Sequence, residues 1–219
     1  LTANLQQGET VFVSVDEGAS WQAASTQVGQ TTWSLANANL MAGAHSVKVK
    51  VTDTAGNDGA IVSAAYEYDA QAPTVTSVEI IGTTGAQNSR LNAGDVVTTT
   101  VTFDEPVTVS GAPQLTLKIG TTPVQAAYSI GSGSNQLQFT YTIQSGQTDA
   151  NGIGIDANSL SLNGGSITDT AGNAVTLTHA AVTDNSNALV DTTAPIMAVL
   201  TPLTNGANVP ANADNVLNI

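Results

Sequence analysis

The chain of 219 residues carries 17 acidic and only 4 basic side chains, which gives a net charge of −13 at pH 7. This charge would repel a phosphate backbone, so nucleic-acid binding is excluded. The sequence contains no cysteine, which removes disulfides, thiolate metal sites and cysteine nucleophiles together. No apolar run approaches the roughly 18 residues of a membrane-spanning helix, and we expect no membrane insertion.

Five segments alternate apolar and polar residues with a period of two. In chain order they are 11–15 (VFVSV), 47–51 (VKVKV), 97–103 (VTTTVTF), 115–119 (LTLKI) and 137–143 (LQFTYTI). This period is typical of a strand with one buried face. Turn-forming stretches separate the segments, and no amphipathic helix is evident. The pattern predicts an all-β chain built from antiparallel β-sandwiches.

The chain also contains an internal repeat. Residues 51–57 read VTDTAGN and residues 167–173 read ITDTAGN, a match at six of seven positions. Each copy is followed by a strand-like segment and then by Asp-x-x-Ala-Pro, so that Pro195 lies 122 positions after Pro73. Because proline interrupts a sheet ladder and stiffens the chain, we interpret both prolines as domain joints.

These joints divide the chain into three predicted domains. The first covers residues 1–70, the second covers 71–192, and the third begins at 193 and runs to 219. A seven-stranded sandwich has about 100 residues, so we expect the first and third domains to be truncated and the second to be complete. The chain is therefore expected to be a segment of a longer protein.

Four motifs together resemble a known family. They are the repeated VTDTAGN, the joint DTTAP at 191–195, VSVDEGASW at 13–21 and FDEPV at 103–107. With them, nearly the whole chain resembles the tandem bacterial Ig-like domains of giant repetitive (RTX-type) surface adhesins of Gram-negative bacteria. The resemblance implies Ig-like antiparallel sandwiches arranged end to end in an extracellular stalk at the bacterial cell surface. Such a stalk would be stiffened by calcium and would have no enzymatic activity.

The sandwich topology by itself predicts where acidic residues meet. The linker, the B–C loop and the F–G loop should converge at the N-terminal end of the second domain. They carry Asp69, Asp104, Glu105, Asp169 and Asn173. Four carboxylates at one joint repel one another unless a cation lies between them, and calcium prefers such oxygen ligands. Since neighbouring residues on a strand point in opposite directions, we expect only one of Asp104 and Glu105 to be a ligand, and we favour Glu105.

Three further acidic residues are candidate ligands. Asp53, in the first copy of the repeat, should face a domain that precedes residue 1, whereas Asp191 should pair with loops of the third domain. The oxygen-rich stretch 149–156 should point towards Asp191, and Asp16, in the turn 16–18, should project towards Asp69. For Asp16 and for both copies of the repeat, the alternative is an ordinary turn in which Asp accepts hydrogen bonds from its own backbone.

No arrangement of residues favours an enzyme, because the carboxylates lie in repeated joint motifs and neither His45 nor His179 has a serine nucleophile elbow or metal-ligand spacing near it. The leading hypothesis is a non-catalytic, monomeric spacer whose partners are the neighbouring domains of the same chain. The alternative is a module that binds carbohydrate, ice or a host protein through threonine hydroxyls in the strand 98–102. Trp21 and Trp33 are expected in the core, although an exposed aromatic pair could bind sugar.

Overall fold

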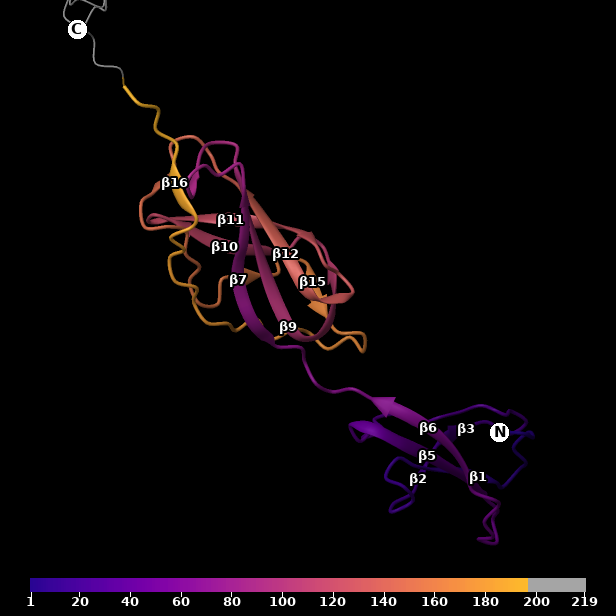
Figure 1. Cartoon of the computed structure of the whole chain (residues 1–219). Helices are drawn as coiled ribbons and strands as arrows, with labels where there is room; N and C mark the ends of the chain where they lie inside the picture. The colour runs from indigo at the N-terminus through magenta and orange to yellow at the C-terminus, as the bar shows by residue number, and fades with distance from the viewer. Residues whose placement is uncertain (197–219) are drawn as a thin grey trace, which may run out of the picture.

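The computed structural model describes residues 1–196, and Figure 1 shows that all regular structure in this part of the chain is β. No helix that could span a membrane is found among these residues. The all-β prediction is therefore confirmed for residues 1–196. The predicted start of a third domain at 193–219 lies almost wholly outside the described residues.

Residues 1–68 build a small antiparallel sheet. Its strand order is β2 (Gln22–Ala23), β1 (Thr10–Ser14), β5 (Gly43–Thr52) and β6 (Val62–Tyr68), while β3 (Ser25–Thr26) pairs with β4 (Trp33–Ser34). The predicted strands 11–15 and 47–51 correspond to β1 and β5. The buried apolar residues of this unit are Leu5, Val11, Val13 and Val15. No residue of β5 or β6 is fully buried, so the sheet keeps part of its apolar face open.

Residues 75–191 build a larger unit around β9 (Val96–Ser110). In its main sheet the order is β14 (Leu160–Ser161), β10 (Gln114–Ile119), β11 (Thr122–Ile130), β12 (Ser134–Thr142), β9 and β15 (Ser166–Thr168), and β7 (Val75–Thr84) also pairs with β9. A smaller sheet contains β13 (Thr148–Asp149), β16 (Leu189–Asp191) and β8 (Arg90–Leu91), with β16 parallel to β8.

The core of the larger unit follows from the alternation in its strands. Leu115, Leu117 and Ile119 of β10 are buried, and the residues between them are half-buried. Leu137 and Phe139 of β12 repeat the pattern. One face of each strand therefore packs into a single hydrophobic cluster, and the predicted strands 97–103, 115–119 and 137–143 are confirmed.

The predicted B–C loop at residues 104–106 is wrong, because β9 continues through it. Thr102 pairs with Gln136 of β12, but Val107 pairs with Ser134, so β9 carries three extra residues between these pairs. Phe103 and Val107 are both buried and hold the two ends of this bulge in the core. Such a bulge bends a strand and re-aims its side chains, and it tolerates a proline. Beyond it, β9 pairs with β15.

The two units have separate hydrophobic clusters, and residues 69–74 connect β6 to β7 (Figure 1). Pro73 is buried, and its carbonyl accepts a hydrogen bond of 2.8 Å from the amide of Thr176. The start of β7 is therefore tied to the segment that follows the second copy of the repeat, by a parallel bridge between Thr74 and Thr176.

The alternative hypothesis of a ligand-binding module depends on exposed threonine and tryptophan side chains, and these are only partly exposed. In β9, Thr99 is fully buried and Thr100 is 6% exposed, so the strand 98–102 does not present an open row of hydroxyls. Both tryptophans are half-buried rather than buried. Trp33 packs against the cluster of the first unit, and the ring of Trp21 lies 4.8 Å from the Lys50 ammonium.

Candidate metal centre

Both copies of the repeat fold into the same turn. In the second copy, Asp169 Oδ1 accepts hydrogen bonds from the amides of Gly172 and Asn173, and Asp169 Oδ2 accepts one from Asn173 Nδ2. In the first copy, Asp53 accepts the same two bonds from Asn57, at 2.9 Å each. The sequence repeat is therefore a repeated turn, in which aspartate stands in for a backbone acceptor.

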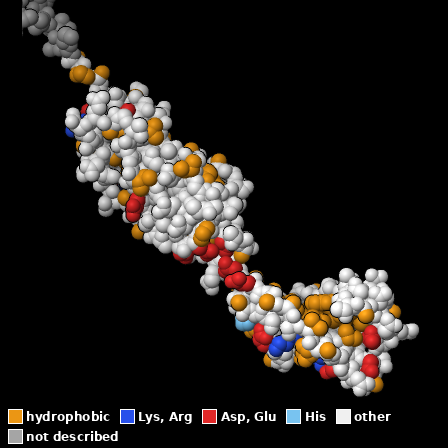
Figure 2. Space-filling model, turned by 45° about the vertical axis from the view of Figure 1, so that its right-hand side comes forward, with side chains coloured by type: hydrophobic (Ala, Val, Ile, Leu, Met, Phe, Trp, Pro, Cys, Tyr) orange, Lys and Arg blue, Asp and Glu red, His pale blue; other side chains and the backbone are white. Residues whose placement is uncertain are grey.

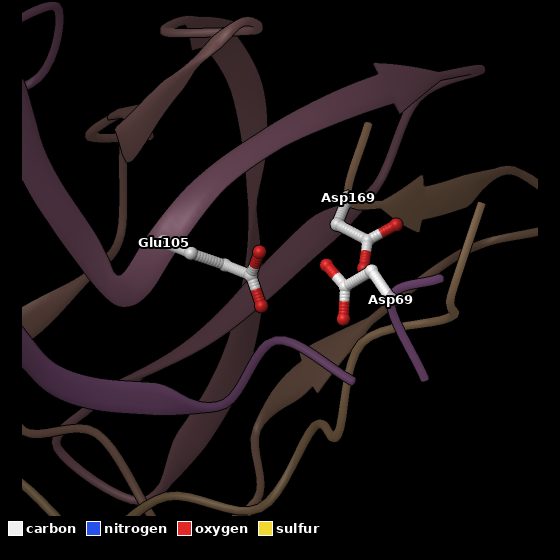
Figure 3. A group of neighbouring side chains, drawn as sticks. All are labelled: Asp69, Glu105 and Asp169. Atoms are coloured by element: carbon white, nitrogen blue, oxygen red, sulfur yellow. The ribbon is translucent and has the colours of Figure 1, made fainter. Parts of the chain in front are cut away.

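Asp69, Glu105 and Asp169 bring their carboxylates together at the connection between the two units. One oxygen from each lies within 4.8 Å of the others, and Figure 3 shows the three side chains pointing toward one another. They come from the connecting segment, from the bulge of β9 and from the turn after β15. We call these three residues the acidic cluster. In Figure 2, acidic side chains gather at the same place.

The acidic cluster has no basic partner in the described part of the chain. Three of the four basic side chains pair elsewhere, namely Lys48 with Glu17, Lys50 with Asp58, and Lys118 with Asp156. Arg90, the fourth, lines a cleft with Asp191. The negative charges of the acidic cluster are therefore not balanced by the protein itself.

This imbalance changes the ionisation of Glu105. Burial first, and then the negative charges of Asp169, Asp69 and Asp104, raise the pKa of Glu105 above its usual value. For Asp169, which is 3% exposed, burial acts in the same direction, but the hydrogen bonds from Asn173 and Gly172 outweigh it and lower the pKa. Asp169 is thus held as a carboxylate, and its charge makes the ionisation of Glu105 costly.

The bulge separates the roles of Asp104 and Glu105. Asp104 turns to the start of β7, where its oxygens accept bonds of 2.8 Å from the Thr74 amide and 2.6 Å from the Thr74 hydroxyl. These bonds lower the pKa of Asp104. Glu105 joins the acidic cluster, as expected, while Asp104 anchors β7. The sequence reasoning did not single out Thr74, and the only signal for it is its position directly after the joint proline.

Asn173 links the connecting segment to the repeated turn. Its Nδ2 donates to the backbone carbonyl of Asp69 at 3.1 Å as well as to Asp169. Asp69 Oδ1 in turn accepts a bond from the amide of Gln71. Of the five residues predicted at this joint, three form the acidic cluster, Asn173 braces it, and Asp104 lies beside it.

The other candidate ligands lie outside the acidic cluster. Asp16 is occupied in its own turn by bonds from Ser14, from the Ser20 amide and from the Ser20 hydroxyl, and these bonds lower its pKa to about 2. Asp53 caps its own turn.

Asp191 lies in β16, opposite Thr148, and lines a cleft of about 470 Å³. Asp149 in the stretch 149–156 is buried, where the amides of Gly120 and Gly152 donate to its carboxylate. Its charge is therefore satisfied by the backbone of its own unit.

The donor set of the acidic cluster fits a hard divalent cation. Calcium binds six to eight oxygens at about 2.3–2.6 Å, so two of its ligands are at most about 5 Å apart. The 4.8 Å limit on the carboxylate oxygens lies within this span. Three carboxylates can supply up to six oxygens if each binds through both, and the Asp69 carbonyl lies next to them. Asp69, Glu105 and Asp169 are thus the residues that would hold calcium.

The histidines have structural contacts. The amide of Ser159 donates to His179 Nε2 at 2.8 Å, and the His45 ring nitrogen Nε2 lies 3.1 Å from the Ala42 carbonyl.

Comparisons with family models, with curated proteins and with solved structures found no match to this chain.

Proposed function

We propose that this chain is a non-catalytic spacer segment of a bacterial cell-surface adhesin, built from Ig-like domains in tandem and stiffened by calcium at the joint. The observation that carries the proposal is the acidic cluster at the connection between two β units. The motifs that resemble tandem adhesin domains, among them the repeated turn and the two Asp-x-x-Ala-Pro joints, support the family. An adhesin segment would be extracellular.

The placement of the three carboxylates explains how a cation would stiffen the joint. Asp69 belongs to the connecting segment, whereas Glu105 and Asp169 belong to the larger unit. Without a cation their like charges repel, and the connecting segment is pushed away from the larger unit. A bound cation would hold all three, and the hydrogen bond from Asn173 to the Asp69 carbonyl would then tie the same segment a second time.

The test is a distance distribution between spin labels on the two units. The chain has no cysteine, so Gln27→Cys and Gln125→Cys, both at exposed positions, provide unique labelling sites. Labelled chain diluted in unlabelled chain is measured with calcium and with chelator. We expect a narrow distribution with calcium and a broad one with chelator.

A matched variant isolates the joint. Asp69→Ala should give the broad distribution under both conditions, because the connecting segment no longer contributes a ligand, and it should leave the melting of both units intact. A distribution equally narrow in all samples would mean that Pro73 and direct packing set the geometry, and the calcium-stiffened spacer would be abandoned.

A further inference from the structure

Two asparagines in the described part of the chain are followed directly by glycine. They are Asn151, before Gly152, and Asn163, before Gly164. An asparagine loses its side-chain amide without an enzyme when the backbone nitrogen of the next residue attacks its side-chain carbonyl carbon. Glycine permits this attack best, because it has no side chain in the way and has the widest range of backbone angles. The surroundings of each pair therefore decide whether it reacts in the folded protein.

The fold holds the first pair in place. The Gly152 amide donates to Oδ1 of the buried Asp149 at 2.9 Å, so the attacking nitrogen is already engaged. Gly152 is itself buried, and a Cβ at this position would clash with the Asn185 carbonyl oxygen, so the backbone is tightly packed there. Asn151 Nδ2 donates to Asp184. Reaction at Asn151 would first require local opening of this segment, which costs free energy.

The second pair forms an exposed turn between β14 and β15. The Gly165 amide donates to the Leu162 carbonyl at 2.8 Å, and the φ angles of Asn163 and Gly164 are +47° and +77°, as at the centre of a type I′ turn. Both residues are exposed, and the Gly164 amide has no hydrogen-bond partner among the described residues. A Cβ on Gly164 would meet nothing within 4 Å. The attacking nitrogen is therefore unengaged and open to water.

Two exposed hydrogen bonds hold Asn163 in its turn. Its Nδ2 donates to the Ala112 carbonyl at 3.1 Å, and its backbone amide donates to Ser161 Oγ at 3.3 Å. Asn163 must release these bonds before its side-chain carbonyl carbon can turn to the Gly164 nitrogen. Water replaces the partners at an exposed position, so the net cost of release is small. Rotation at Asn163 therefore costs less than opening the buried surroundings of Gly152.

We propose that Asn163 is a site of spontaneous deamidation in the folded protein, and that the fold protects Asn151. The Gly164 backbone nitrogen forms a bond to Asn163 Cγ, the Cγ–Nδ2 bond breaks, and ammonia leaves with the proton of the Gly164 amide. Water then adds to one of the two carbonyls of the resulting succinimide ring and opens it. The product is aspartate or isoaspartate at position 163, and no oxidant or reductant is needed.

The reaction changes the contact between this turn and the loop after β9. A carboxylate at position 163 cannot donate to the Ala112 carbonyl, and its negative charge lies beside that oxygen. Isoaspartate also lengthens the main chain of the turn by one carbon. The turn has little room for this change, because a Cβ on Gly111 would already lie 2.8 Å from the Gly165 Cα. We therefore expect the modified chain to be more acidic and its larger unit to be less stable.

The first experiment incubates the folded full chain at mildly alkaline pH and follows both asparagines by peptide mapping with mass spectrometry. Asn163 should convert at least about tenfold faster than Asn151, because only Asn151 must wait for local opening. In guanidinium, where the fold is lost, the two rates should approach each other, since glycine follows both. Enzymatic methylation of isoaspartate identifies the second product. Equal rates in the folded chain, or a faster rate at Asn151, would overturn the proposal.

Two matched substitutions connect the modification to stability. Asn163→Gln keeps a side-chain amide but reacts much more slowly, because its ring would have six members, so its melting temperature should stay constant during incubation. The parent chain and Asn151→Gln should both lose stability over the same period. A constant melting temperature in the parent while Asn163 converts would contradict the expected effect on the turn. The acidic cluster takes no part in this reaction, so failure here would leave the calcium joint standing.

Discussion

Glu105 carries its carboxylate into a group of like charges, and its neighbours decide its ionisation. Its pKa is raised by burial and by three nearby carboxylates. For an acid with a raised pKa in the folded state, ionisation opposes folding above that pKa, and protonation relieves the cost as the pH falls. The same repulsion is what a divalent cation would remove. If the proposed cation binds, Glu105 would couple pH, cation binding and stability at one residue.

Glu105→Gln should therefore change the stability of the larger unit in opposite directions with and without calcium. In chelator the melting temperature of the larger unit should rise, because one of the repelling charges is gone. With calcium, the affinity should fall at least about tenfold, and the stabilisation of about 2.7 kcal/mol expected at a hundredfold excess over the dissociation constant should shrink. Calorimetric titration and thermal melts measure both effects.

Glu79→Gln is the matched control, since Glu79 is exposed on β7 and outside the acidic cluster. It should leave both quantities unchanged. If Glu79→Gln and Glu105→Gln shift the melting temperature and the calcium affinity alike, net charge rather than the cluster is responsible.

Asp16 shows the opposite shift, with a pKa lowered to about 2 mainly by the hydroxyl and amide of Ser20. A lowered pKa contributes stability that is present above the ordinary value of 3.8 and is lost as the pH falls towards 2. The chain has two tryptophans, both in the first unit, so tryptophan fluorescence follows this unit alone. We expect its urea midpoint to fall between about pH 4 and pH 2, and to fall much less in Asp16→Ala. A midpoint with the same pH dependence in both proteins would count against this role.

At the scale of elements, the repeated turn and the bulge of β9 together build the acidic cluster. The turn holds Asp169 in place through the amides of Gly172 and Asn173, and the bulge re-aims Glu105 toward it. The first copy of the turn has the same hydrogen bonds but no such strand beside it among the described residues. The second copy of the turn is therefore part of a candidate site, while the first copy has no such neighbour among the described residues.

Asp53→Ala and Asp169→Ala form a pair that separates these roles. Both remove the acceptor of the same turn, so each should lower the melting temperature of its own unit. Only Asp169→Ala should abolish calcium binding to the dilute chain, as measured by titration. Loss of binding in Asp53→Ala would place the ion elsewhere.

The hairpin between β11 and β12 depends on glycine at one position. Gly131 has φ +117°, and a Cβ there would lie 2.0 Å from the Gln136 carbonyl oxygen, whereas Gly133 has φ +88° and open space around it. Gly133→Ala should cost about 1–2 kcal/mol of unfolding free energy from backbone strain alone. Gly131→Ala should cost clearly more, because the hairpin must also open. Equal losses in urea unfolding would show that the loop rearranges freely.

At the scale of the molecule, the described residues form two separate hydrophobic clusters joined by a single connecting segment. A compact particle of this length has a radius of gyration of roughly 17 Å. We expect small-angle scattering of the dilute chain to give a clearly larger value with calcium, because the proposed joint keeps the two units apart. A value near the compact one would contradict the spacer.

The sequence by itself determined five of the strands, which correspond to β1, β5, β9, β10 and β12, and the repeated turn. The apolar–polar alternation at 115–119 and 137–143 appears in the structure as alternating burial, because each segment has one face in the core. The repeated turn could be predicted as well. An aspartate that accepts hydrogen bonds from amides three and four residues ahead depends only on neighbouring residues in the sequence. These features depend on neighbours in sequence, and they could be predicted without knowing the fold.

The sequence predicted a set of acidic residues near one joint, and only the tertiary structure decided which of their carboxylates meet. On a strand, side-chain direction follows from register. The four residues 103–106 lie opposite a single residue of β12, so the register changes at the point where Asp104 and Glu105 lie. Their separate roles therefore depend on where β7, β12 and β15 pair with β9. Asp16 and Asp69 were both predicted near this joint, but only Asp69 lies in the cluster, where Asn173 donates to its backbone carbonyl. Contacts between residues about a hundred positions apart are set by packing, and no local pattern contains them.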